Sequence, residues 1–195
     1  MRHFGIPFAE ITVPLAQENT RAEILRYSPA AKCPVLLDGN EPVWDSLSII
    51  EYIAELYPEL PVWPKAQRAR AVARSLAAEM HSGFTGLRTC LPMNLRRVVS
   101  KRELSPEAAA DVSRIEDAFR EARGQFGRRG MFLFGDFSAA DAMFAPVVNR
   151  LHVYDVPVSA ATRAYMDAVM ALPAWQEWAA AARAEPWMIA KYEIS

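Results

Sequence analysis

The pattern of apolar and polar positions predicts that this chain begins with short strands and one short helix. Apolar and polar residues alternate from Phe8 to Val13, which is typical of a strand, and Thr20 to Tyr27 fits a short helix. Two more short strands are predicted at Val35–Leu37 and Pro42–Trp44. The turn residues Asp38-Gly39-Asn40 lie between them and favour a hairpin.

The rest of the chain carries the apolar spacing of amphipathic helices. Residues 61–65 include two prolines and predict a linker between this helical part and the first part. Apolar residues then recur at helical spacing over most of the remaining chain, which predicts a part without strands. Helices are predicted over residues 66–87, 105–126 and 163–170 and from Pro173 onward.

One segment joins an X-Pro bond, the hairpin and the start of a helix. Cys33-Pro34 opens the first strand of the hairpin, and this bond is a candidate for the cis isomer. Asp45-Ser46 follows the second strand, with Ser46 as the predicted N-cap of an amphipathic helix. A hydroxyl, a backbone N–H and a positive helix end would converge on an anion there, while Asp45 could accept from an ammonium group. Taken singly, Ser46 only caps its helix and Pro34 only begins a strand.

A second motif lies in the helical part, at Ser138-Ala139-Ala140-Asp141. It follows Gly135 and Phe137, and it has the spacing of a capping box with Asp in place of the usual Glu. Ser138 would bond the backbone N–H of Asp141, and the Asp141 carboxylate would reach back to the N–H of Ser138. The motif predicts a role in folding and none in catalysis.

Composition narrows the class of protein. The 195 residues are 52% hydrophobic, which is enough for a core in one domain or two small ones, and the formal net charge is -1. Nothing in this charge favours nucleic acid or an anionic membrane as a partner, and a cytoplasmic protein is expected. The two cysteines, Cys33 and Cys90, lie far apart without neighbouring histidines, so we expect neither a disulfide framework nor a metal site.

The central segment and the capping box together resemble the cytosolic glutathione transferases. Leu91-Pro92-Met93-Asn94 followed by arginines resembles a set of bacterial, zeta-like members related to maleylacetoacetate isomerase. The resemblance implies an α+β fold class, with a thioredoxin-like glutathione-binding domain over residues 1–60, the linker 61–65 and an all-α domain over residues 66–195. It places glutathione, the co-substrate, on these residues: Lys32, Cys33, Pro34, Asp45 and Ser46.

The resemblance also suggests where a second substrate would lie. The long helix after the linker faces the electrophile pocket and the dimer partner in this family, so His81, Phe84 and Arg88 are pocket candidates and a homodimer is expected. A lone histidine on such a helix also fits a core or surface position. Arg96 and Arg97 could attract an acidic substrate, although a solvated pair at a helix end is the simpler interpretation.

Compared with the family, the first part looks shortened. Gly5-Ile6-Pro7 resembles a helix end with no helix before it, so the first strand and most of the first helix of the family are missing, roughly 20 residues. The family's thiol-activating residue lies in that part, so no catalytic residue is assigned, and the backbone of Cys33 is expected to matter more than its thiol. We expect a detoxification-type transferase that binds glutathione and conjugates or isomerises a small electrophile. The alternative is a non-catalytic binding or interaction module with the same fold.

Overall fold

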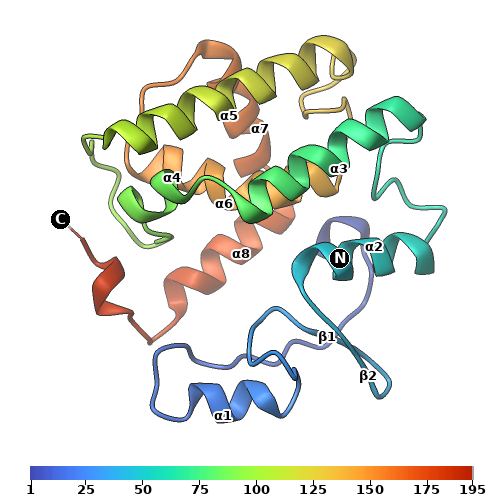
Figure 1. Cartoon of the computed structure of the whole chain (residues 1–195), viewed down its shortest axis with the longest axis vertical. Coiled ribbons are helices and arrows are strands. Elements are labelled where there is room, and N and C mark those ends of the chain that lie inside the picture. The colour runs from blue at the N-terminus through green and yellow to red at the C-terminus, as the bar shows by residue number, and fades with distance from the viewer. Residues whose placement is uncertain (195) are drawn as a thin grey trace. The chain divides into compact units, whose positions relative to one another are not determined.

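The computed structural model describes residues 1–194 (Figure 1). The chain separates into two compact units. The first unit comprises Met1–Val62 together with Trp187–Ile189, and the second runs from Trp63 to Pro186 and resumes at Ala190. The two units are described separately below.

The first unit contains a β-hairpin and two helices. The elements are the 3-10 helix η1 (Arg2–Phe4), α1 (Thr20–Leu25), β1 (Leu36–Asp38), β2 (Glu41–Val43) and α2 (Ser46–Leu56). The two strands are antiparallel, with Leu36 opposite Val43 and Asp38 opposite Glu41. Gly39 takes a left-handed φ of 60° in the turn, a conformation that glycine adopts without steric cost. The described part of the chain therefore holds the predicted hairpin and helix, with strand bounds shifted by one residue.

The strand predicted from Phe8 to Val13 is wrong. This segment belongs to no strand in the described residues, and the side chain of Ile11 is 60% exposed. Alternation specifies a strand only where a partner strand supplies hydrogen bonds and a core covers the apolar face. The sheet of the described chain has two strands, β1 and β2, so neither support reaches this segment.

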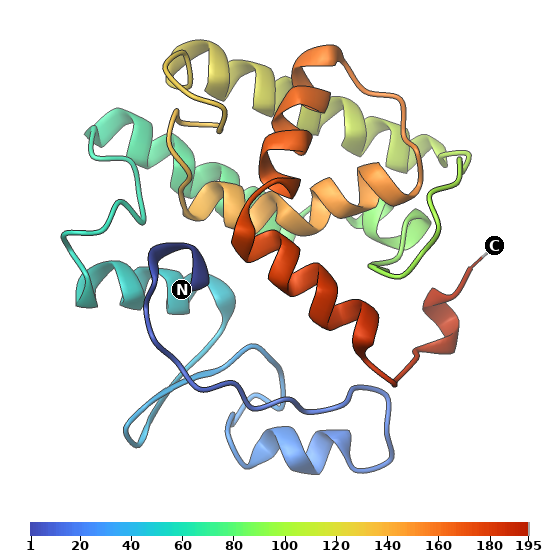
Figure 2. The ribbon, with the colours of Figure 1, turned by 180° about the vertical axis from the view of Figure 1, so that it is seen from behind.

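The second unit is helical and is built around α6 (Ala139–Val153). It also contains α3 (Gln67–Ser82), α4 (Thr85–Cys90), α5 (Pro106–Gln125), α7 (Ala160–Met170), α8 (Pro173–Ala184) and the 3-10 helix η2 (Ala190–Tyr192). Eleven residues of α6 are buried, which marks it as the central helix. It packs against α3 and α7, and α7 lies across α5 in the view from behind (Figure 2).

The single helix predicted over residues 66–87 is interrupted at Gly83-Phe84. α3 ends at Ser82, Phe84 takes a left-handed φ of 56°, and α4 begins at Thr85. A side chain at position 83 would place its Cβ 2.7 Å from the carbonyl oxygen of Glu79, so only glycine fits there. Phe84 is buried and its ring lies 6.3 Å from that of Phe144. Burial of this aromatic ring offsets the cost of its backbone conformation.

The capping box is present at the start of α6. The Asp141 Oδ2 accepts hydrogen bonds from the backbone N–H of Ser138 at 2.8 Å and from its hydroxyl at 3.0 Å, and the Ser138 side chain in turn caps the helix. The Asp141 Oδ1 accepts from the N–H of Leu133 at 3.0 Å, which ties the preceding loop to the helix. Burial raises the pKa of Asp141, while these donors act in the opposite direction.

The last long helix, α8, buries one of its two tryptophans. Trp175 is 8% exposed, whereas Trp178 is 39% exposed. The two rings meet edge to face at 5.3 Å between centroids. Trp178 therefore packs mainly on its neighbour and lies at the edge of the core.

None of the described helices is both long enough and apolar enough to cross a bilayer.

Candidate functional site

The hairpin brings the two predicted ligand-binding pairs to one end. Cys33-Pro34 lies just before β1, and Asp45-Ser46 lies just after β2. Because Leu36 pairs with Val43 in an antiparallel ladder, the chain enters β1 and leaves β2 at the same end. The turn at Gly39 lies at the other end. The Cys33–Pro34 peptide bond is cis in the structure, and both residues are exposed.

The N-cap of α2 is Asp45, one residue earlier than the sequence predicts. Asp45 has an extended backbone and its Oδ1 accepts a hydrogen bond from the N–H of Leu47 at 3.2 Å, while Ser46 is the first residue of the helix. A carboxylate is a better acceptor than a hydroxyl at the positive end of a helix, which explains the shift. Ser46, half-buried in the first turn, thus lies where the helix presents N–H groups.

A tyrosine of α2 holds this helix to the hairpin. The Tyr52 hydroxyl donates to Asp38 Oδ2 at 2.7 Å, from the middle of α2 to the last residue of β1. This hydrogen bond raises the pKa of Tyr52, because loss of the hydroxyl proton would place a second negative charge beside Asp38. The contact fixes the direction of α2 relative to the end of the hairpin from which Asp45 and Ser46 emerge.

The start of α2 has the electrostatics of an anion site. The first turn contains no acidic residue, and the N-terminus carries the positive end of the helix dipole. Lys32 is exposed one residue before Cys33 and adds a cation to this end of the hairpin sequence. The Asp45 carboxylate already accepts from the Leu47 N–H at this helix end, so a ligand carboxylate at Ser46 would share the positive end of the helix with it.

The three pocket candidates lie at the junction of α3 and α4, where their described contacts are with the protein's own helices. Phe84 is buried in the helical core, and His81 is half-buried in the last turn of α3. Arg88 folds back from α4 and donates to the backbone oxygens of Met80 and His81, so its guanidinium caps the C-terminal end of α3. The structure brings the three together, and their contact with a substrate stays a prediction.

Side chains of α6 and of Tyr154, the residue that follows it, hold the segment at residues 91–94, which the sequence reasoning missed. Arg150 Nε donates to Leu91 O at 2.9 Å, the Tyr154 hydroxyl donates to Pro92 O at 2.9 Å, and Asn149 Nδ2 donates to Asn94 O at 3.2 Å. These donors satisfy carbonyls of an irregular segment that would otherwise be buried without partners. The sequence signal was present as polar residues within the apolar spacing of α6.

Arg150 is the buried cation of this region. Its relative exposure is 9%, and its side chain donates to the backbone oxygens of Leu91 and Pro146 and to the Met93 sulfur. Burial first, and the nearby charge of Arg88 second, lower the pKa of Arg150 to about 10, so it remains charged at neutral pH. Its position at the end of α4 places the charge beside the negative pole of that helix.

In residues 1–194, no group of three or more His, Cys, Asp and Glu side chains lies where it could hold a metal ion.

Two family models match the chain. The model of the glutathione S-transferase N-terminal domain matches residues 1–56, and that of the glutathione S-transferase C-terminal domain matches residues 105–181. The first match contains the end of the hairpin with Asp45 and Ser46, and the second contains the capping box at Ser138 and Asp141. The chain belongs to the glutathione S-transferase family. Its distant relatives include a zeta-class glutathione S-transferase and a probable maleylacetoacetate isomerase.

Individual relatives agree with this family. The chain is 32% identical over 92 residues to a probable maleylacetoacetate isomerase of Caenorhabditis elegans, a match that spans 47% of this chain and 42% of that protein. It is 26% identical over 173 residues to a stringent starvation protein A homolog of Haemophilus ducreyi, which covers 84% of this chain and 77% of that protein. The first match spans less than half of the relative's length.

A solved structure shares the fold. A glutathione transferase homolog from Burkholderia, with bound glutathione, superposes with a TM-score of 0.71 at 24% identity, covering 94% of this chain and 88% of that one. The fold of the described chain is thus the glutathione transferase fold, with a thioredoxin-like N-terminal domain that has a short sheet and an all-helical C-terminal domain.

Proposed function

We propose that this protein binds glutathione and transfers it to, or uses it to isomerise, a small electrophilic substrate. The observation that carries the proposal is the end of the hairpin at which Cys33-Pro34 and Asp45-Ser46 emerge together. In this proposal the γ-glutamyl carboxylate of glutathione lies at Ser46 and the first turn of α2, and its ammonium group meets Asp45. The backbone of Cys33 would pair with the cysteinyl part of the ligand, and Lys32 would lie beside it.

The chemistry asked of the protein is modest. In a conjugation by substitution, the glutathione sulfur forms a bond to the electrophilic carbon, the leaving group departs with its electron pair, and the thiol proton goes to solvent. The protein contributes position and a lowered thiol pKa. We assign no thiol-activating residue among those described. The residues proposed to contact the electrophilic substrate are His81, Phe84 and Arg88. We also propose that the protein forms a homodimer.

The experiment is a turnover assay with glutathione and an activated chloronitrobenzene, followed by absorbance of the thioether product. A parallel assay follows cis–trans isomerisation of an unsaturated acid that has a cis double bond. Glutathione-dependent product above the uncatalysed rate in either assay supports the proposal. Bound glutathione with neither reaction would leave the transferase part of the proposal wrong.

A second candidate is a binding module without turnover, and one observation favours it. In the described residues β1 pairs only with β2, and Leu37 on β1 is 41% exposed. A two-stranded sheet is marginal without further support, so an added strand along β1 would complete the first unit. A chain that binds glutathione but shows no turnover until such a strand is supplied fits this second function.

A further inference from the structure

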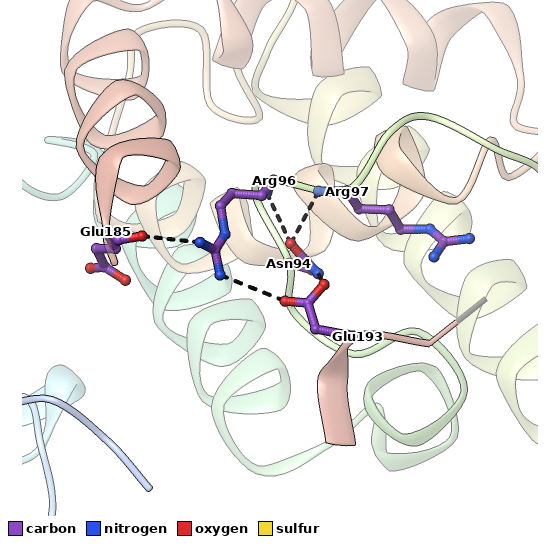
Figure 3. Close-up of polar contacts among 5 residues, drawn as sticks. All are labelled: Asn94, Arg96, Arg97, Glu185 and Glu193. Atoms are coloured by element: carbon purple, nitrogen blue, oxygen red, sulfur yellow. Dashed lines mark hydrogen bonds and ion pairs between the residues drawn. The ribbon is translucent and has the colours of Figure 1, made fainter. Parts of the chain in front are cut away.

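Asn94 shapes a basic loop in the second unit. The Asn94 Oδ1 accepts hydrogen bonds from the backbone N–H groups of Arg96, at 2.9 Å, and Arg97, at 3.0 Å (Figure 3). This bends the segment so that the Asn94 amide Nδ2 points outward next to Arg96. Residues 91–102 contain four cations and no carboxylate, the cations being Arg96, Arg97, Lys101 and Arg102. The loop is thus a concentrated positive segment in a chain of net charge -1.

A carboxylate from the far end of the sequence lies on this loop. The Glu193 Oε2 accepts from Asn94 Nδ2 at 2.9 Å, and its Oε1 lies 3.7 Å from Arg96 Nη2 (Figure 3). Each carboxylate oxygen therefore meets a different donor group, one amide and one guanidinium, which is how proteins recognise carboxylates. Arg96 Nη1 also donates to the backbone oxygen of Glu185 at 3.0 Å.

Arg97 binds the backbone carbonyl group of the residue that follows Glu193. Arg97 Nη1 donates to the carbonyl oxygen of Ile194, and its Nη2 donates to the Ser100 hydroxyl at 2.8 Å. The guanidinium lies 4.5 Å from the ring centroid of Tyr154, which fixes its plane. The loop therefore recognises a peptide feature, an acidic side chain and the next carbonyl group, and the Glu193-Ile194 pair supplies both.

We propose that Asn94, Arg96 and Arg97 form a docking site for an acidic segment of a partner protein, and that residues 190–194 close this site as an internal competitor. The partner segment would place a Glu or Asp carboxylate on Asn94 and Arg96, and its next carbonyl on Arg97. Charge complementarity and the seated internal segment argue for this occupant.

The internal contact is weak enough to be displaced. The side chains of Arg96 and Glu193 are 29% and 40% exposed, and ion pairs with such exposure contribute little to stability. The internal segment acts mainly through its high effective concentration. A partner with a pre-ordered acidic segment can therefore compete, and salt should weaken both occupants.

Closure of the site is tested by limited trypsin digestion of the full chain. Lys191 is exposed within the closing segment, so cleavage after it reports release of that segment. We expect Glu193→Gln and Arg96→Ala to speed this cleavage several-fold. Glu103→Gln removes an exposed carboxylate that lies just after the loop and pairs with Lys101, and it should leave the cleavage rate unchanged. Equal cleavage rates in all four proteins would overturn the internal closure.

Docking is tested with a labelled peptide of residues 187–194, read by fluorescence anisotropy. The Glu193→Ala chain should bind this peptide about tenfold more tightly than the Arg96→Ala/Glu193→Ala chain does. A peptide with Gln in place of its Glu should bind the Glu193→Ala chain as weakly as the original peptide binds the double variant. Equal binding by both chains, or no binding to Glu193→Ala, would overturn the proposal. A dimer of the unmodified chain that becomes a monomer in Arg96→Ala would show that a second copy fills the site, and would also contradict it.

Discussion

Asp111 of α5 caps α4 from a neighbouring helix, because its Oδ2 accepts a hydrogen bond from the backbone N–H of Leu87 at 2.8 Å. Leu87 is the third residue of α4, one of the positions whose N–H has no partner within the helix. The residue that precedes α4 is Phe84, which has no side-chain acceptor. A six-residue helix therefore obtains its cap from a residue 24 positions later in the sequence.

Replacing Asp111 by Ala should lower the free energy of unfolding by about 1 kcal/mol, the usual loss for a removed N-cap. Asp111→Asn keeps an oxygen acceptor and should lose less. Asp117→Ala removes an exposed carboxylate that pairs with Arg120 on the same helix and is the matched control. Denaturant unfolding of the four proteins checks the order, and an equal loss for Asp111→Ala and Asp117→Ala would show that the cap contributes nothing.

Two glycine substitutions in the helical unit should change stability in opposite directions. A Cβ at Gly86 would lie 2.7 Å from the backbone carbon of Glu107 and 2.9 Å from the nitrogen of Ala108, so Gly86→Ala should destabilise by about 1–3 kcal/mol or more. A Cβ at Gly124 in α5 would meet no atom within 4 Å, so Gly124→Ala should stabilise by about 0.5–1 kcal/mol. Thermal unfolding shows whether each substitution raises or lowers the stability. A stabilised Gly86→Ala would mean that α4 and α5 do not pack together as described.

Acid should weaken the contact between Glu116 and the start of α7. Partial burial acts to raise the pKa of Glu116, but hydrogen bonds from the backbone and hydroxyl of Ser159 and from Thr162 outweigh it, so the pKa lies below its ordinary value of 4.5. A carboxyl with a lower pKa in the folded state contributes stability above its unfolded pKa, and this contribution is lost as the pH falls through the folded pKa.

The stability difference between the unmodified chain and Glu116→Gln should therefore be constant near neutral pH and shrink below about pH 4.5. The free energies of unfolding of these proteins, measured from neutral pH to below about pH 4.5, test this expectation. A difference that grows with acid would contradict the assigned hydrogen bonds.

Local sequence signals predicted the features that depend on nearby residues. The hairpin, the start of α2 and the capping box at Ser138 and Asp141 each depend on a few consecutive positions, and each is found in the structure. The strand predicted from Phe8 to Val13 failed because alternation alone does not supply a partner strand. The break at Gly83-Phe84 was missed because the apolar spacing continues through it while the backbone does not.

Features that join distant parts of the chain were beyond these signals. The Asn94–Glu193 contact joins residues 99 positions apart, and the Asp111–Leu87 cap joins residues 24 apart. Nothing in the spacing near Arg96 distinguishes a solvated arginine from one that contacts Glu185 and Glu193. In the candidate glutathione site, the sequence located both residue pairs, whereas the antiparallel register was needed to place them at one end of the hairpin.

Calorimetric titration of glutathione into the unmodified chain, Ser46→Ala and Ser48→Ala is the decisive test of the proposed glutathione site. Ser46 lies in the first turn of α2 at the proposed carboxylate position, and Ser48 is an exposed residue of the same turn. We predict binding by the unmodified chain, roughly tenfold weaker binding by Ser46→Ala through loss of a charge-assisted hydrogen bond, and unchanged binding by Ser48→Ala. Absence of binding by the unmodified chain, or equal affinities in all three proteins, would contradict the proposed site.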